Sequence, residues 1–233
     1  MGFACCSVTL NLTNSTISGN SSTGHGGGIG TSGATIRNST ITDNSAGFTG
    51  GGIWRWGGAG TIEIANTIVA ENVADVAGND LAGAFATIQD SLIGDITGAT
   101  ITTNVNNLIG VDPQLLPLGD YGGATQSHAL HPDSPAINAG NNALAAGLDQ
   151  RGANRLNGKV DLGAFEAQGY SFTLSAGNNQ STTVNTNFAT DLQVQVVETF
   201  EDKPLPIAGI EITLNPLGTG ANASLGNTTL TTE

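Results

Sequence analysis

A short sequence pattern recurs four times in the first half of the chain, and it constrains the fold more than any other feature. The segments NSTISGN, NSTITDN, NTIVAEN and DSLIGD follow one another at steps of 24, 28 and 24 residues, starting at Asn14, Asn38, Asn66 and Asp90. Apolar residues keep the same steps, and one column of them comprises Ile17, Ile41, Val69 and Ile93. A fixed period of this length indicates a solenoid, in which each repeat packs on its neighbours.

Within each repeat, apolar and polar residues alternate over short stretches such as TLNLT, ATIRN and TIEIA. This alternation predicts β-strands with one buried face, because the stretches are too short for helices. Three short strands and glycine-rich corners in each period fit one coil of a right-handed parallel β-helix, where equivalent residues stack about 4.8 Å apart. We therefore predict an all-β fold with about four coils over residues 1–106, and the apolar columns inside it.

The residues that open the repeats also have a predicted structural role. Asparagine tolerates a left-handed backbone at a turn, and stacked asparagines can hydrogen-bond to one another through their amides. Glycine triplets at 26–28 and 50–52 would let the backbone form corners that are closed to residues with a Cβ. We expect a structural ladder formed by Asn14, Asn38, Asn66 and Asp90.

The charge of the chain limits its partners. It has 19 acidic and 6 basic side chains, and a formal net charge of -13. Because Lys and Arg are needed to displace counterions from phosphates, we exclude nucleic acid and an anionic membrane surface as partners. No stretch approaches the roughly 18 apolar residues of a membrane-spanning helix. The surplus of Asn, Thr and Ser is typical of a β-rich extracellular protein.

Both tryptophans of the chain fall in the segment GGGIWRWGGAG, near the four residues that lengthen the second step (28 − 24). Trp54, Arg55 and Trp56 could form a platform that contacts glycans, because aromatic faces suit pyranose rings. Alternatively, the tryptophans lie over the outside of a sheet against Arg55, with a purely structural role. The residues alone favour the structural alternative, and the three side chains remain the candidate glycan contacts.

The repeats resemble the parallel β-helix repeats of bacterial polymorphic outer membrane proteins. From Asn107 to Glu166 the segments NLIGVDPQLLPLGDYGGATQSHALHPDSPAINAG and LDQRGANRLNGKVDLGAFE resemble the conserved end of the choice-of-anchor Q domain. In that family the segment closes a β-helix, in proteins that reach the cell surface through varied C-terminal anchors. The resemblance implies that residues 107–167 close the solenoid.

The same segment is predicted to be a cap by its own residues. Its prolines interrupt regular strand pairing, and a cap would cover the unpaired strand edges at a solenoid end. Arg155 and the acidic and basic residues around it supply both charges for an internal ion-pair network; the cap residues that we single out are Asp112, Asp149, Arg151, Asp161 and Glu166. His128 and His131 could bind a metal, but two ligands without a third favour a structural role.

Residues 168–233 differ in character from the repeats. Alternating stretches at 192–196 and 210–214 predict strands separated by a proline-containing turn. This part resembles the bacterial immunoglobulin-like domains of invasin and intimin, which serve as rigid tandem spacers in adhesins. The usual terminal strand does not appear before Glu233, so we expect a partial β-sandwich, incomplete at its C-terminus, in a longer polypeptide with further repeat domains.

Two classes of function follow from these features. The first is a non-catalytic part of a large secreted or surface-anchored bacterial protein, at the cell surface or outer membrane, acting as an adhesin-like stalk or binding scaffold. Its partners would be glycans or molecules of a host or neighbouring cell surface.

The second class is a polysaccharide lyase or glycoside hydrolase. Such enzymes need carboxylates, or a carboxylate with Arg or Lys, clustered on one sheet face. The coils offer only scattered charged residues, which are Arg37, Asp43, Arg55, Glu63, Glu71 and Asp75. We therefore expect no catalytic residues, no cofactor and no metal.

Overall fold

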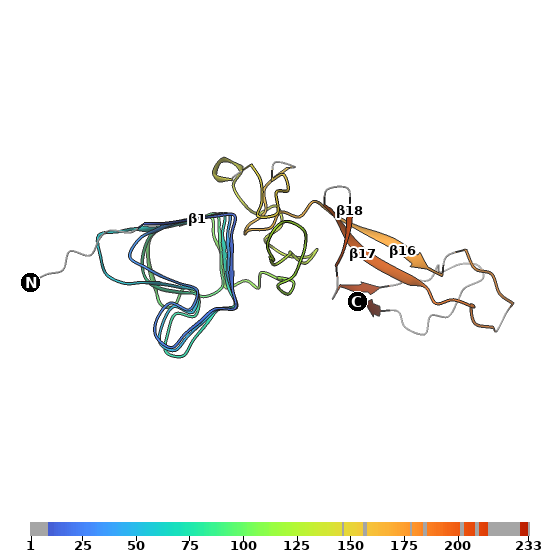
Figure 1. The fold of residues 1–233 in the computed structure, drawn as a ribbon, viewed down its shortest axis with the longest axis horizontal. Helices are drawn as coiled ribbons and strands as arrows, with labels where there is room; N and C mark the ends of the chain where they lie inside the picture. The colour runs from blue at the N-terminus through green and yellow to red at the C-terminus, as the bar shows by residue number, and fades with distance from the viewer. Residues whose placement is uncertain are drawn as a thin grey trace, which may run out of the picture. The chain divides into compact units, whose positions relative to one another are not determined.

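The structure, a computed structural model, describes residues 9–145, 147–155, 158–177, 179–183, 186–200, 203–207, 210–213 and 229–232. The chain divides into two compact units, Met1–Ala167 and Gln168–Glu233 (Figure 1). In the described residues the helical content is a single turn of 3-10 helix, η1 (Asn142–Leu144). The predicted all-β class is confirmed.

The first unit contains a parallel β-solenoid of about four turns. Its first two coils contain β1 (Leu10–Thr13), β2 (Thr16–Ser18), β3 (Ser21–Ser22), β4 (Ile29–Thr31), β5 (Ala34–Arg37), β6 (Thr40–Thr42), β7 (Ser45–Ala46) and β8 (Ile53–Arg55). The later coils contain β9 (Ile62–Ala65), β10 (Ile68–Val69), β11 (Val73–Ala74), β12 (Leu81–Gln89), β13 (Leu92–Ile93), β14 (Ala99–Val105) and β15 (Leu108–Ile109).

Equivalent strands of successive coils form parallel sheets. One sheet has the order β15-β13-β10-β6-β2, and another has the order β11-β7-β3. The largest follows β1-β5-β9-β12-β8-β4, with β14 also paired to β12, because the long strand β12 ends the third coil and begins the fourth. Strand β15 still pairs with β13, so the parallel ladder continues past the predicted coil boundary at residue 106.

The predicted apolar column is confirmed by the strand register. Ile41 is paired with Ile17 on one side and with Val69 on the other, and Val69 is paired with Ile93. Ile41, Val69 and Ile93 are completely buried, and Ile17 is partly buried against the same core. The repeat in the sequence therefore corresponds to a ladder of like side chains along the solenoid interior.

The residues that open the repeats adopt the predicted left-handed backbone. The φ angles of Asn14, Asn38, Asn66 and Asp90 lie between 46° and 48°. The expectation that their side chains bond to one another is wrong for these four described residues. Asn14 donates to the carbonyl of Leu148 and Asn66 donates to that of Asn141, because a later segment of the chain lies beside this column.

A different asparagine ladder lies inside the solenoid. The Nδ2 group of Asn20 donates to Oδ1 of Asn44 (3.0 Å), Asn44 donates to Asn72 (2.9 Å), and Asn72 donates to Asp80 (2.8 Å). Each Oδ1 atom also accepts the backbone N–H of the preceding member. Asn44, Asn72 and Asp80 are buried, so the ladder satisfies polar groups that would otherwise be costly inside the solenoid.

Asp80 ends this ladder as a buried carboxylate. Its Oδ2 atom accepts the backbone N–H of Asp95, and the two N–H groups of Asn72 bond to Oδ1. Burial raises the pKa of Asp80 from 3.8 to about 6, although these hydrogen bonds oppose the shift. The folded protein therefore binds this proton more tightly than the unfolded chain does, and the associated stability is lost as the pH rises through about 6.

This shift predicts a pH effect that depends on Asp80. When the pH is raised from 5 to 7, the free energy of unfolding should fall by roughly 1 kcal/mol more for the wild type than for Asp80→Asn. The measurement is urea unfolding at both pH values, followed by the fluorescence of the two tryptophans, which both lie in the first unit. An equal change in both proteins would contradict the raised pKa.

The segment predicted to cap the solenoid lies along its side. We call residues 110–167 the lateral cover; Figure 1 shows it in yellow-green beside the superimposed coils. Its Gly163 approaches the outward side chains of Thr40 and Ile68 so closely that a Cβ there would lie 2.7 Å from Thr40 Oγ1 and 2.9 Å from Ile68 Cδ1. The predicted position over the solenoid end is therefore corrected: this segment covers the outer face of the sheet that contains β2, β6 and β10.

The second unit contains a small antiparallel sheet of β16 (Tyr170–Ala176), β17 (Gln193–Phe200) and β18 (Lys203–Ile207). A separate ladder pairs β19 (Glu211–Thr213) with β20 (Thr229–Thr231). The two predicted strands are present as β17 and β19, but the predicted proline-containing turn between them contains strand β18. Pro204 and Pro206 lie in that strand, whose sole neighbour among the described strands is β17, as expected for proline at a sheet edge.

Candidate functional site: an exposed aromatic platform

Four aromatic rings from two neighbouring coils meet on the surface of the first unit. The ring of His25 stacks on Trp54 with centroids 4.4 Å apart, and it also faces Phe48 at 5.3 Å. Trp56 lies beside Trp54 at 5.6 Å, with the two rings tilted by 58°. We call these four residues the aromatic platform, and it contains both tryptophans of the chain.

The strands of the solenoid hold the platform in place. Trp54 belongs to β8 and is paired with Gly30 on β4 and with Ala82 on β12, so its neighbours on both sides are small. His25 is held by a 2.7 Å hydrogen bond between Nδ1 and the hydroxyl of Thr49. The rings are thus fixed by paired backbone and by one another, which lowers the entropy lost when a ligand binds.

The platform is open to solvent. Phe48 is 52% exposed and Trp56 is 43% exposed, whereas the other large apolar side chains of β8 and its neighbours face the core. Val76, on the next coil, is also exposed, and its backbone N–H donates to the carbonyl of Phe48. Aromatic side chains that remain in water despite this packing are a candidate contact surface.

Arg55 has a different role from the two tryptophans. Its guanidinium donates to the carbonyl oxygens of Gly60 (2.6 Å) and Gly58 (3.1 Å). The side chain therefore stabilises the loop made by the longer second repeat. Of the three predicted glycan contacts, the structure brings Trp54 and Trp56 together and directs Arg55 to its own loop.

The sequence analysis missed His25 and Phe48 as members of the platform. The repeat register could have found them, because Thr49, which bonds to His25, stands 24 residues after it and Phe48 precedes Thr49 directly. When HGGGI (residues 25–29) is aligned with TGGGI (residues 49–53), His25 and Phe48 fall beside the same glycine-rich corner of successive coils.

Among the charged side chains of the described coils, Asp43 and Glu71 lie close enough to each other, and to Asp112 of the lateral cover, for their charges to interact. Glu63 on β9 is paired with Thr35 and Thr87 on its two sides. Asp43 and Glu71 lie at left-handed corners, with φ angles of 56° and 60°. Burial raises the pKa of Glu71, and the charges of Asp112 and Asp43 raise it further, so these carboxylates repel one another.

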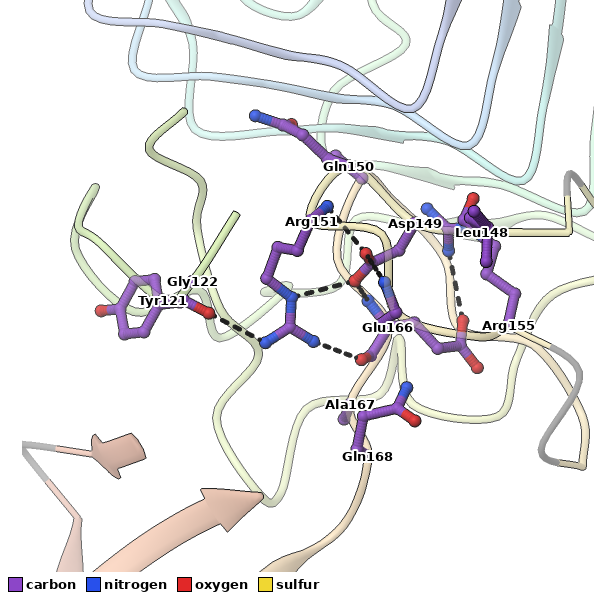
Figure 2. A network of polar contacts seen from close by, with 12 residues as sticks. Tyr121, Gly122, Leu148, Asp149, Gln150, Arg151, Arg155, Glu166, Ala167 and Gln168 are labelled. Atoms are coloured by element: carbon purple, nitrogen blue, oxygen red, sulfur yellow. Dashed lines mark hydrogen bonds and ion pairs between the residues drawn. The ribbon is translucent and has the colours of Figure 1, made fainter. Parts of the chain in front are cut away.

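Three of the predicted cap residues, Asp149, Arg151 and Glu166, form a buried network with Arg155 inside the lateral cover (Figure 2). Asp149 pairs with Arg151 (3.0 Å), and Arg155 pairs with Glu166 (3.2 Å). Arg151 also donates to the carbonyls of Tyr121 and Glu166, and its guanidinium lies 3.7 Å above the ring of Phe165. These contacts confirm the internal network.

The remaining cap residues divide between this network and the surface. Asp161 accepts the backbone N–H groups of Asn138 and Ala167, and its own N–H donates to Glu166. Burial and the neighbouring Asp161 raise the pKa of Glu166. Asp112 is exposed, and it accepts the N–H of Gln114 outside the network. The buried charges therefore hold the cover together.

His128 is buried between the lateral cover and the first coil. Its Nδ1 atom lies 2.8 Å from the carbonyl oxygen of Leu116, and its Nε2 atom lies 2.8 Å from the hydroxyl of Ser18. Because a carbonyl only accepts, Nδ1 is the donor in the bond to Leu116. Asp43 is 4.0 Å from Nε2. The predicted structural role of His128 is consistent with these contacts.

A polar hollow lies between the fourth coil and the lateral cover, lined in part by Asp90, Asn106, Asn141, Asn142 and Lys159. Asp90 accepts from the amides of Asn106 (3.3 Å) and Asn141 (3.1 Å), and Asn142 donates to the carbonyl of Gly158. Most of its polar groups are thus bonded to one another, which favours a structural role.

Two further searches of the described residues were negative. No helix among them is long and apolar enough to cross a membrane. No group of three or more His, Cys, Asp or Glu side chains in the described part of the chain is placed to hold a metal ion.

The fold and the platform define a parallel β-solenoid with an exposed aromatic surface. No protein-family model, curated protein or solved structure matches the chain. The two family resemblances of the sequence are therefore carried forward as proposals.

Proposed function

We propose that the chain is a non-catalytic binding scaffold of a secreted or surface-anchored bacterial protein, and that the aromatic platform binds glycans. The observation that carries this proposal is the cluster of His25, Phe48, Trp54 and Trp56, with Phe48 and Trp56 about half exposed. Rigid aromatic rings in water provide apolar faces for the axial C–H groups of pyranose rings, at a low entropic cost.

The charges around the platform favour an uncharged glycan. The chain has a net charge of -13, so it repels polyanionic chains such as those of uronic acids. Arg55, which stands between the two tryptophans in the sequence, is bonded to the carbonyls of Gly58 and Gly60. Arg151 and Arg155 are buried within the lateral cover.

The second unit is the proposed spacer part of the scaffold. Its antiparallel strands β16, β17 and β18 are compatible with one sheet of an immunoglobulin-like domain, as the sequence resemblance implies. Residues 214–228 and 233 lie outside the described residues, so the expected incomplete end of the sandwich stays a prediction. A stalk built from such units would hold the solenoid away from the cell.

The binding proposal predicts a defined loss of affinity. Trp56→Ala and Phe48→Ala should each weaken binding of an uncharged polysaccharide by about tenfold, because each removes an exposed ring face. Affinity electrophoresis through gels that contain laminarin, xyloglucan or glucomannan measures the effect, with alginate and polygalacturonate as acidic comparisons. Phe172→Ala is the control, because Phe172 is an aromatic of the second unit that is even more exposed than Phe48 and Trp56.

Two results would contradict the proposal. If none of the uncharged glycans retains the wild-type protein, the aromatic platform is not a glycan-binding site. Shortening of any of these chains during incubation, abolished by Asp43→Asn or Glu63→Gln, would replace the scaffold function by the alternative polysaccharide lyase or hydrolase.

A further inference from the structure

We propose that the lateral cover is a strap that ties the first coil of the solenoid to the last, so that the coils resist tension as one unit. The inference rests on the proposed stalk function for its biological meaning, but its evidence is the set of contacts between the cover and the coils. A strap differs from an end cap because it contacts every coil along the axis.

The cover makes three side-chain contacts with the first coil. Thr16 on β2 donates to the side-chain oxygen of Gln150 (2.7 Å), Ser18 bonds to His128 (2.8 Å), and Asn14 donates to the carbonyl of Leu148 (2.7 Å). The residues of these pairs are between 110 and 134 positions apart in the sequence. The cover thus returns from the end of the solenoid to its beginning.

The cover also bonds to the second and third coils. The backbone N–H of Ala164 donates to the hydroxyl of Thr40 (3.0 Å), and that of Gly163 donates to the carbonyl of Asn66 (3.0 Å). Asn66 exchanges two hydrogen bonds with Asn141, through its amide nitrogen and its amide oxygen. The fourth coil is reached through Asn141, which donates to Asp90 (3.1 Å).

Ion pairs and hydrogen bonds cross-link the interior of the cover. Arg151 and Arg155 join its loops through Asp149, Tyr121, Glu166 and Gly163, all with side chains or backbone inside the cover. A force applied at Ala167 acts directly on Asp161, because the backbone N–H of Ala167 donates to the carboxylate of Asp161 (2.7 Å). The applied force is therefore borne by the bonds of this network together, and does not break the hydrogen bonds of one strand in sequence.

The consequence concerns the order in which the coils separate. A solenoid held only by neighbouring coils unfolds in small steps from its ends, because each repeat contacts only the next. With the strap, separating the first coil also requires breaking its bonds to His128, Leu148 and Gln150. Once these bonds break, the whole segment between Thr16 and Gln150 unfolds in one event. The two residues are 134 positions apart, which corresponds to about 470 Å of extended chain.

The test is single-molecule pulling on the full chain through its two ends. The variant Thr16→Val/Ser18→Ala removes two of the three side-chain contacts to the first coil and leaves the interior columns unchanged. The control Asn11→Ala/Thr13→Val alters the same coil at two side chains of β1 that are exposed.

We expect the wild type and the control to release the first unit in one step of about 470 Å or more, and the variant to release it in steps of about 80–100 Å, one coil at a time. Hydrogen exchange gives a second readout: in the variant, the backbone N–H groups of Thr40, Ser45 and Gly47, which bond to the first coil, should lose protection. Coil-by-coil release of the wild type, or an unchanged single step in the variant, would overturn the strap. Neither result depends on glycan binding.

Discussion

Replacing Gly51 by alanine should destabilise the solenoid by about 3 kcal/mol or more, because the added methyl group has no space. A Cβ at Gly51 would lie 2.3 Å from the carbonyl oxygen of Val73 and 2.5 Å from that of Asn79. Both atoms belong to the backbone of the next coil, which is held by hydrogen bonds from Gly52 and Gly51 and cannot rotate away.

Gly57→Ala is the control for this change, because no atom lies within 4 Å of a Cβ built at Gly57. Urea unfolding followed by tryptophan fluorescence compares the two variants with the wild type. The control should stay within about 0.5 kcal/mol of the wild type. A Gly51→Ala protein as stable as the control would show that neighbouring coils are not as close as described.

Asn44→Ala should cost about 3 kcal/mol, because several buried polar groups lose their partner at once. The Nδ2 group of Asn44 bonds to the carbonyls of Ile17 and Thr42, and its Oδ1 atom accepts the backbone and side-chain N–H groups of Asn20. The residue is completely buried, so water cannot replace these bonds without opening the coil.

Asn11→Ala provides the matched control for the ladder, since Asn11 lies on the exposed face of β1 and is not part of it. Hydrogen exchange at Asn20 and Asn44 should accelerate in Asn44→Ala and remain unchanged in the control. Similar unfolding free energies for the two variants would mean that the interior ladder contributes little to stability.

The solenoid could be predicted from the sequence because each repeat contributes the same side chain at the same place. Ile17, Ile41, Val69 and Ile93 keep one register, and the left-handed residue that opens each repeat is Asn or Asp. These are local requirements that recur every coil, so the periodicity of the sequence expresses them directly.

The position of the lateral cover could not be predicted in the same way, because it depends on contacts between residues more than 100 positions apart. One signal was present. In the third and fourth coils both neighbouring residues of the strand are apolar, as in Ile68–Val69 and Leu92–Ile93, and all four are buried. A strand buried on both faces indicates that something covers its outside.

The candidate site was predicted only in part, for a similar reason. Trp54 and Trp56 are conspicuous in the sequence, but the platform also needs His25 from the preceding coil and Phe48 from the corner before β8. The sequence grouped Arg55 with the two tryptophans as a candidate glycan contact. In the structure its guanidinium bonds to the carbonyls of Gly58 and Gly60 instead, and the orientation of these carbonyls depends on the folded loop.

Tryptophan fluorescence tests the glycan-binding proposal most directly, because both tryptophans of the chain belong to the aromatic platform. Titration of the wild type with uncharged oligosaccharides should shift the emission in a saturable way, and Phe48→Ala should weaken the response without removing either reporter. Acidic oligosaccharides should leave the emission unchanged. If an uncharged glycan retains the protein on a gel but leaves the emission spectrum constant, the binding surface lies away from the aromatic platform. That result for every such glycan would contradict the proposal.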